Sequence, residues 1–293
     1  MQTKLTFTLA KKSAFQDGHY LYLQSESFQT ALLSVAARSA QAGFSKADIS
    51  PFELGVPPIP EQKRIVAILD QTFADIEQAR AKTEQNLKNA RELFESYLQQ
   101  VFSQRGEGVL DTIVGEQITL QRGFDITKKQ QRPGDVPVVS SGGIKSYHDT
   151  SMVDAPGVVI GRKGSLGTVF FLDENYWPHD TTLWVKDFKG NDPKLVYYLL
   201  LGLDVKSLDS GAANPALNRN LVHPLAISWP EKNKQKKLVS ALDALAGNIS
   251  DLEKIYSQKL DSIDELKKSI LQKAFSGELT KAPDNEIIKG AAA

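Results

Sequence analysis

The chain has 293 residues, and 41% of them are hydrophobic, which is enough to build a core in one or two domains. It has no cysteine, which excludes disulfide scaffolds, thiolate metal sites and cysteine nucleophiles. Its 35 basic and 35 acidic residues balance, so binding to a polyanion must depend on local patches or on a partner.

The first 50 residues precede the first clear motif. Neither they nor the rest of the chain contain an apolar run approaching the roughly 20 residues that span a bilayer. The N-terminus also lacks the apolar stretch of a signal peptide. We therefore expect a cytoplasmic protein without membrane contact.

Residues 51–107 are predicted to form an extended segment followed by a long helix. Pro57, Pro58 and Pro60 end the extended segment, and a proline is tolerated at a helix start because its missing N–H has no partner there. About 42 helical residues, at roughly 1.5 Å each, give a length of about 60 Å. An apolar stripe, interrupted by polar Thr83, follows one face and comprises Ile65, Leu69, Phe73, Ile76, Leu87, Leu93 and Leu98.

Residues 108–223 differ in character from the predicted helix. Short β-branched and aromatic runs alternate with Gly, Pro, Asn and Asp turns, which is typical of a compact mixed domain. The region holds 12 basic and 13 acidic residues, but the part from Arg122 to Lys163 holds 7 and 4, a mild basic bias. Strands are predicted within 136–141, 157–161, 167–172 and 181–188, a buried helix at 195–203 and a loop at 207–224.

The motif GRKGSLG at 161–167 is the most suggestive short stretch. Its glycines would let backbone N–H groups approach a phosphate, and Arg162 and Lys163 would add charge. It lacks the spacing of a Walker A loop, and it opens a strand, unlike a dinucleotide fingerprint, which opens a helix. The alternative is a glycine-rich hairpin with two exposed basic residues.

Residues 224–281 repeat residues 51–107. Gln62 and Gln235 lie 235 − 62 = 173 positions apart, and the same offset holds without gaps along both segments. A register kept over this length indicates a duplicated unit. Identical pairs include Pro57/Pro230, Lys63/Lys236, Val66/Val239, Leu69/Leu242, Asp70/Asp243, Ile76/Ile249, Leu98/Leu271 and Phe102/Phe275.

The second copy is predicted to be a second long helix with a heptad seam. The seam is Leu238, Leu242, Leu245, Ile249, Leu252, Tyr256, Ile263, Leu266 and Ile270, with Lys259 as one polar intruder. A long helix with one apolar seam needs a partner, so we expect the duplicates to pack antiparallel. EKNKQKK at 231–237 places four lysines where the helix dipole disfavours cations, which suggests a binding partner; a solvated end and a spacer without chemistry are the alternatives.

No catalytic pattern is present in the sequence. The four histidines lack metal-ligand spacing, and no GxSxG elbow occurs. Asn214-Pro215-Ala216 lacks the second proline and the aromatic residue of an adenine methyltransferase loop. Glu61, which could begin a nuclease motif, has Lys234 as its repeat equivalent. We expect no catalytic residue, no metal and no cofactor.

Taken together, these motifs resemble the DNA-specificity subunit of type I restriction–modification systems. The resemblance rests on PPIPEQKRIVAILD at 57–70, its echo WPEKNKQKKLVSALD at 229–243, and the helix ends LQQVFSQ and LQKAFSGEL. It also rests on GVVIGRKGSLGTVFF at 157–171, WPHDTTLWV at 177–185 and ANPALNRNLV at 213–222, which are similar to parts of a target-recognition domain.

The resemblance implies an α+β fold, in which an α/β-rich target-recognition domain is flanked by two long helices packed as an antiparallel coiled coil. It implies a non-catalytic subunit that directs modification subunits, and indirectly a restriction subunit, to a bipartite site in double-stranded DNA. The helices would set the half-site spacing and dock the modification subunits. The alternative is a scaffold or decoy that binds modification subunits without reading DNA.

The same resemblance implies a domain map. Residues 1–50 would be the remnant of a first target-recognition domain, 51–107 and 224–281 the long-helix regions, and 108–223 a complete recognition domain. Residues 282–293 would be a tail, disordered or left by an expression vector. With a first domain this short, a homodimer through the helices would present two reading heads and predict a palindromic bipartite target.

The implied site residues form two groups. Candidates for contacts to DNA are Arg122, Lys128, Lys129, Ser140, Ser141, Lys145, Arg162, Lys163, His179, Asp180, Asn214, Asn218 and Arg219. The serines, asparagines, His179 and Asp180 could instead close turns. Candidates for partner binding are Gln62, Lys63, Arg64, Gln235, Lys236 and Lys237.

Overall fold

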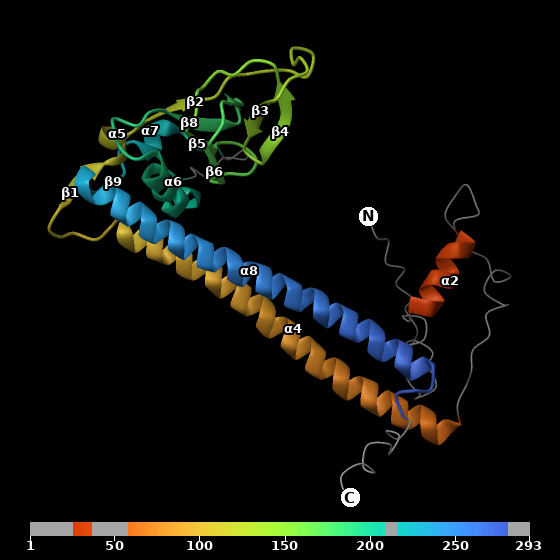
Figure 1. Ribbon diagram of the computed structural model, residues 1–293. Coiled ribbons are helices and arrows are strands. Elements are labelled where there is room, and N and C mark those ends of the chain that lie inside the picture. The colour runs from red at the N-terminus through yellow and green to blue at the C-terminus, as the bar shows by residue number, and fades with distance from the viewer. Residues whose placement is uncertain (1–25, 37–57, 209–215, 281–293) are drawn as a thin grey trace, which may run out of the picture. The chain divides into compact units, whose positions relative to one another are not determined.

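The computed structural model describes residues 26–36, 58–208 and 216–280. Two long helices, α4 (Ile59–Val101) and α8 (Lys232–Phe275), carry the two copies of the repeat (Figure 1). The chain divides into two compact units, Met1–Leu87 with Lys254–Ala293, and Lys88–Glu253. The predicted combination of antiparallel long helices with an α/β-rich domain is confirmed.

The first unit contains the beginning of α4 and the end of α8. Glu77 pairs with Lys267 at 3.0 Å and Arg80 pairs with Asp264, so rising numbers on one helix meet falling numbers on the other. This is the predicted antiparallel arrangement. Its apolar cluster is built on Ile65, Leu69, Leu271 and Ala274. The unit also contains α2 (Glu26–Ala36).

The predicted apolar stripes are only partly buried. Leu69 and Leu242 are fully buried, whereas Leu93, Leu252 and Leu266 are exposed. The reason is geometric, since a helix in a two-stranded pair buries only the side that faces its partner. Thr83, expected to interrupt the stripe, is buried, and its hydroxyl donates to the Ala79 carbonyl at 2.7 Å.

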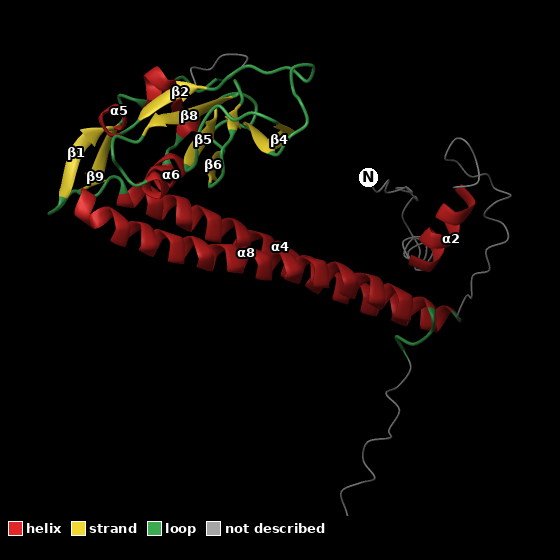
Figure 2. Ribbon diagram, turned by 45° about the horizontal axis from the view of Figure 1, so that its top comes forward, coloured by secondary structure: helices red, strands yellow, loops and turns green. Residues whose placement is uncertain are grey.

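The second unit holds three small sheets (Figure 2). The largest is antiparallel, with the order β2 (Thr119–Arg122), β8 (Thr182–Asp187), β5 (Gly157–Gly161) and β6 (Val169–Leu172). The second has β3 (Val136–Ser140) between β4 (Gly143–His148) and the parallel β7 (Trp177–Pro178). The third pairs β1 (Val109–Ile113) with β9 (Ala226–Pro230).

Apart from its parts of α4 and α8, the helices of this unit are short, and the longest of them is α6 (Pro193–Gly202). Its first residue is a proline, and the Asp192 side chain caps it by accepting from the Lys194 N–H. The segment predicted as a loop at 207–224 includes α7 (Arg219–Val222), and the turn of 3₁₀ helix at Val205–Leu208 overlaps its start. The remaining helix is α5 (Val114–Gln117).

One core joins the sheets of this unit to the adjoining helix segments. Every residue of β5 is buried, and α6 covers it with Leu195 and Leu199. Leu98 of α4 and Leu242 of α8 belong to the same cluster. Gly202 of α6 lies so close to α4 that an added Cβ would be 2.8 Å from the Leu98 Cβ. The sheets and the adjoining helix segments therefore form one packed body.

No helix in the described ranges is long and apolar enough to cross a membrane.

Candidate nucleic-acid interface

Thr181, in the turn between β7 and β8, holds three segments together. Its carbonyl accepts from the N–H groups of Arg162 at 2.8 Å and Lys163 at 3.1 Å. Its hydroxyl accepts from the Ser141 N–H at 3.3 Å. The turns after β3, β5 and β7 therefore meet at one edge, which we call the Thr181 edge.

A charged cluster lies at the same edge. The Arg122 guanidinium, at the end of β2, donates to Asp180 at 2.8 Å. His179 Nδ1 lies 3.0 Å from the other Asp180 oxygen and 3.1 Å from the Thr181 hydroxyl. Gly123 permits this approach, because a Cβ there would come within 2.2 Å of the His179 carbonyl. Arg122 is more than half exposed, so it keeps donors available to a ligand.

Arg162 is the best-placed basic side chain at this edge. It is half-buried, and its Nη1 is buried without a hydrogen-bond partner among the residues that the structure describes. Its carbonyl accepts from the Leu217 N–H at 2.9 Å, which connects the edge to the approach to α7. A buried cationic donor that lacks a partner is costly, and an acceptor supplied by a ligand would relieve that cost. Lys163, next to it, is exposed.

The motif at 161–167 forms a hairpin turn between β5 and β6, as one of the two interpretations predicts. Gly164 and Gly167 both adopt φ of 79°, a left-handed conformation that favours glycine. The other interpretation, approach of backbone N–H groups to a phosphate, stays a prediction. The N–H groups of Arg162 and Lys163 are not available for it, because they already donate to the Thr181 carbonyl.

The other candidate residues divide between turn closure and open surface. Ser140 donates to the Gly143 carbonyl at 2.9 Å, and Asn218 caps α7 by accepting from Asn220 at 3.0 Å. Exposed positions are those of Lys128, Lys129, Lys145 and Arg219. Asn214 lies outside the described residues.

Arg132 lies in the basic stretch but is already engaged. Its guanidinium binds Asp149 at 2.5 Å and 3.0 Å. Hydrogen bonding from Arg132, and then from Thr150, lowers the pKa of Asp149 to about 2. A paired guanidinium is less available to DNA, so the mild basic bias of the sequence overstates the free positive charge.

Sequence reasoning missed Thr181 and Asp125. Thr181 follows His179-Asp180 in the motif, but its residue type does not distinguish it from Thr182. Asp125, His179 and Asp180 each place a ligand atom within 4.8 Å of the others, a spacing that suits a cation. Arg122 already neutralises Asp180, however, which weakens this group as a metal site.

The family of this chain follows from its sequence and agrees with its fold. The family model described as the type I restriction modification DNA specificity domain matches residues 4–87 and 115–262, well over half of the chain. The chain belongs to this family of DNA-specificity subunits. Such a subunit confers DNA sequence specificity, and the family is non-catalytic. None of the curated proteins matches the chain.

Solved structures show the same fold at low identity. A chain from a study of complex assembly and conformational transition of the type I R-M system has a TM-score of 0.77. The HsdS subunit from Thermoanaerobacter tengcongensis has 0.55, and the S subunit from M. genitalium has 0.50. Each is 16% identical, and the matches cover 89–90% of this chain and 71–72% of the other.

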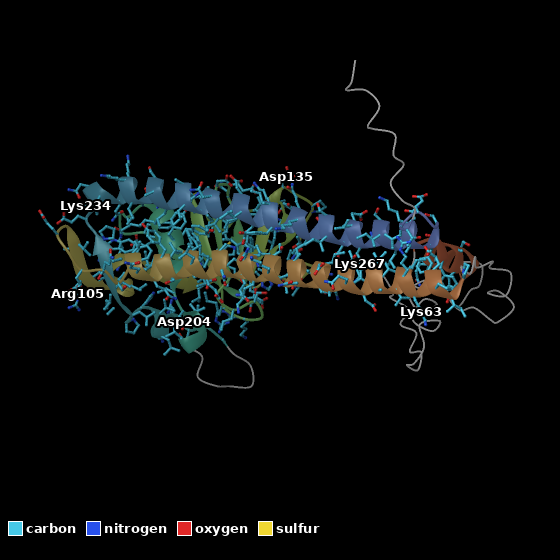
Figure 3. All side chains as sticks on the ribbon, turned by 90° about the horizontal axis from the view of Figure 1, so that it is seen from below. Lys63, Arg105, Asp135, Asp204, Lys234 and Lys267 are labelled. Atoms are coloured by element: carbon cyan, nitrogen blue, oxygen red, sulfur yellow. The ribbon has the colours of Figure 1, made fainter. Side chains whose placement is uncertain are left out.

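The candidate partner-binding residues of this specificity subunit lie at the helix starts. Exposed side chains are those of Lys63 and Arg64 on α4 and Lys236 and Lys237 on α8 (Figure 3 labels Lys63). Gln62 is half-buried. Lys234 donates to the Glu107 carbonyl at 2.7 Å, so one of the four lysines has an internal role.

Gln235 differs from its predicted role, because only 3% of it is exposed. Its Oε1 accepts from the Asp192 N–H at 2.9 Å, and its Nε2 donates to Asn191 at 2.8 Å. The Trp229 indole donates to the same Asn191 oxygen at 3.0 Å. The specificity subunit therefore uses Gln235 to join α8, β9 and the start of α6, and the side chain is not available to a partner.

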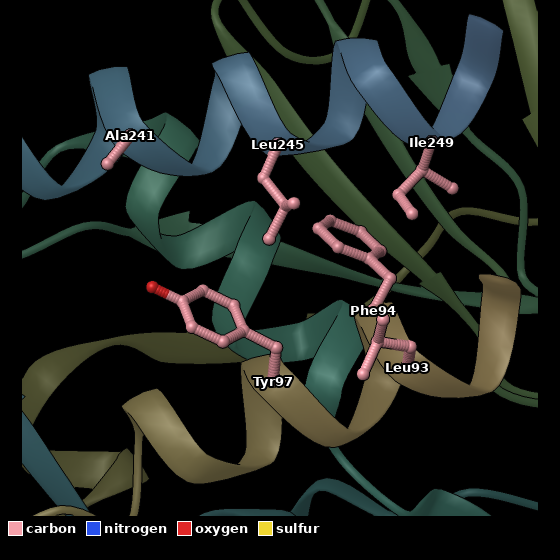
Figure 4. A pocket seen from close by; sticks show the side chains of 6 residues that line it. All are labelled: Leu93, Phe94, Tyr97, Ala241, Leu245 and Ile249. Atoms are coloured by element: carbon pink, nitrogen blue, oxygen red, sulfur yellow. The ribbon is translucent and has the colours of Figure 1, made fainter. Parts of the chain in front are cut away.

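An apolar recess of about 360 Å³ lies between the two helices in the second unit (Figure 4). Leu93, Phe94 and Tyr97 line it from α4, and Ala241, Leu245 and Ile249 from α8. Leu93 is 69% exposed and Tyr97 40%. Large apolar side chains left in solvent around a recess suit a partner's apolar side chains.

Proposed function

We propose that this specificity subunit directs modification subunits, and through them a restriction subunit, to a bipartite site in double-stranded DNA. The membership of the chain in the specificity family, over residues 4–87 and 115–262, carries the proposal. The family implies DNA binding and assembly with modification subunits. The bipartite target, the reading residues and the docking surface are our additions.

In this proposal, the domain at 108–223 reads one half of the site with the Thr181 edge. The convergence of three turns there, with Arg122, Arg162 and Lys163, supports it. Basic side chains would position the phosphates, and polar ones would contact base edges. The remaining proposed contacts are Lys128, Lys129, Ser140, Ser141, Lys145, His179, Asp180, Asn214, Asn218 and Arg219.

The test of the reading edge is Arg162→Ala combined with Lys163→Ala. We expect weaker DNA binding by the complex and a smaller slope of log K against log salt concentration, by about 0.9 for each phosphate that is no longer neutralised. The control, Lys82→Ala with Lys186→Ala, removes two exposed positive charges that are not among the candidate DNA contacts. Unchanged affinity and slope in the first variant would remove Arg162 and Lys163 from the interface.

The helix pair is proposed to dock the modification subunits and to set the spacing of the two half-sites. The exposed side chains of Leu93 and Tyr97 at the apolar recess, and of Lys236 and Lys237 at the start of α8, support a docking role. Within the described ranges there is one domain of this kind, and a bipartite target would need a second reading head beside it. A second copy would give a palindromic target.

A scaffold that binds modification subunits without reading DNA is the second candidate, and the apolar recess favours it equally. Both candidates predict copurification with a modification subunit. Only the first candidate, a subunit that reads DNA, predicts that the purified complex prefers one DNA sequence over shuffled DNA of the same composition. Competition binding with a library of duplexes separates the two.

A further inference from the structure

Three ion pairs join α4 to α8 within the described residues. Arg80 pairs with Asp264, and Lys267 with Glu77 at 3.0 Å, both in the first unit. In the second unit, Arg91 Nε lies 2.5 Å from Glu253 Oε1. Asp264 raises the pKa of Arg80, as a close carboxylate should.

Two of these pairs are related by the sequence repeat. With the offset of 173, the repeat equivalent of Arg80 is Glu253, and that of Arg91 is Asp264. Each arginine is therefore bound by the equivalent of the other arginine. The positions obey the two-fold relation between the copies, but the charges do not, because both arginines are on α4 and both acids on α8.

Several apolar positions carry no such distinction. Leu69 and Leu242 are equivalent, and both are fully buried. Ile76/Ile249 and Leu98/Leu271 are also identical pairs. Hydrophobic matching at these positions therefore does not distinguish an α4–α4 pair from an α4–α8 pair.

The charged residues distinguish an α4–α8 pair from an α4–α4 or an α8–α8 pair. If a second α4 took the place of α8 in the same register, Arg80 would face Arg91 at two levels. If a second α8 took the place of α4, Glu253 would face Asp264 at two levels. The third pair would also disappear, because the equivalents of Glu77 and Lys267 are Ser250 and Phe94. Opposed like charges at helix interfaces disfavour a pairing.

We propose that these ion pairs make the two repeat helices a heterotypic pair, in which α4 accepts only an α8, from its own chain or from a second copy. Two copies that associate through their long helices would then exchange helices, α4 with α8, and would not join like helices. Exposed ion pairs are weak singly, but exchanging two attractions for two repulsions gives a preference of roughly tenfold or more.

Charge reversal in the full chain reproduces both excluded arrangements. Glu253→Arg with Asp264→Arg sets arginine against arginine, as in an α4–α4 pair. Arg80→Glu with Arg91→Glu sets acid against acid, as in an α8–α8 pair. All four substitutions together restore opposite charges. The control is Lys82→Glu with Lys88→Glu, because Lys82 is exposed and Lys88 pairs with Glu92 on its own helix.

Thermal unfolding at low salt measures the effect. We expect each double reversal to lower the Tm by roughly 3 to 8 °C, and the fourfold variant to recover most of that decrease. The control should shift the Tm by less than either reversal. At about 1 M salt, where charges are screened beyond about 3 Å, the differences should shrink.

Additive decreases in the fourfold variant, or reversals no different from the control, would overturn the proposal. If both double reversals fail to fold, the fourfold variant still decides, because it should fold and its failure would contradict the pairing rule. The measurement concerns folding and not DNA binding, so its result is independent of the proposed reading function.

Discussion

His223 illustrates how a single side chain can make the stability of the recognition domain depend on pH. Its Nε2 accepts a hydrogen bond from the Leu120 N–H at 3.0 Å, which only the neutral ring can do. Burial lowers the pKa of His223, and the charges of Arg219 and Lys189 lower it further. Protonation therefore favours the unfolded chain, whose histidine has an ordinary pKa of about 6.5.

The stability contributed by neutral His223 is present above about pH 6.5 and is lost as the pH falls toward the lowered pKa. We predict that the Tm decreases between pH 7.5 and 5.5, and that His223→Gln, which retains an acceptor, reduces this decrease. Calorimetry of both proteins at several pH values checks it. The comparison isolates His223, because His148 and His179 are present in both proteins. Parallel curves of Tm against pH for the two proteins would contradict the role of His223.

At the scale of elements, the sequence predicted what depends on local pattern. The apolar periodicity placed both long helices, and the β-branched runs placed β3, β5, β6 and β8. It missed β1, β2, β4 and β9; the pairing of β1 with β9, for example, joins Val109 to Pro230 across the whole domain. It also missed α7, which depends on the Asn218 cap. The residues of the Thr181 edge were only partly predictable from the sequence. Long-range strand pairing decides which turns come together there.

Gln235 is a second case in which long-range packing limits what the sequence can predict. Its repeat equivalence to Gln62 and its place among lysines predicted a surface role, but burial depends on the packing of β9 and α6. We predict that Gln235→Ala lowers the free energy of unfolding by about 1–3 kcal/mol, because the partly buried Asp192 N–H loses its acceptor. The control Gln258→Ala, at an exposed helical position, should change it by less than about 0.5 kcal/mol.

Urea unfolding of the two glutamine variants provides the measurement. A shift in midpoint at constant m-value in Gln235→Ala alone would support a buried joint between α8 and the recognition domain. Equal midpoints for both variants would indicate that water replaces the missing hydrogen bonds.

At the scale of the whole molecule, balanced charge is compatible with reading DNA. The 35 basic and 35 acidic residues give no general attraction, so specificity must come from a local edge and from the electrostatics of partners. The ion pairs between α4 and α8 favour the pairing of one repeat helix with the other and disfavour the pairing of two identical helices. Under the proposed function, this pairing would help to hold the reading heads and the modification subunits at a fixed separation.

The central claim is that this chain selects a bipartite DNA sequence for modification. The most direct measurement is to co-express it with its cognate modification subunit and map base methylation across a genome. We predict one bipartite motif, palindromic if a second copy supplies the other reading head and asymmetric if another chain or segment does. Methylation without any motif, or none from an intact complex, would contradict the claim and leave the helices as a docking scaffold.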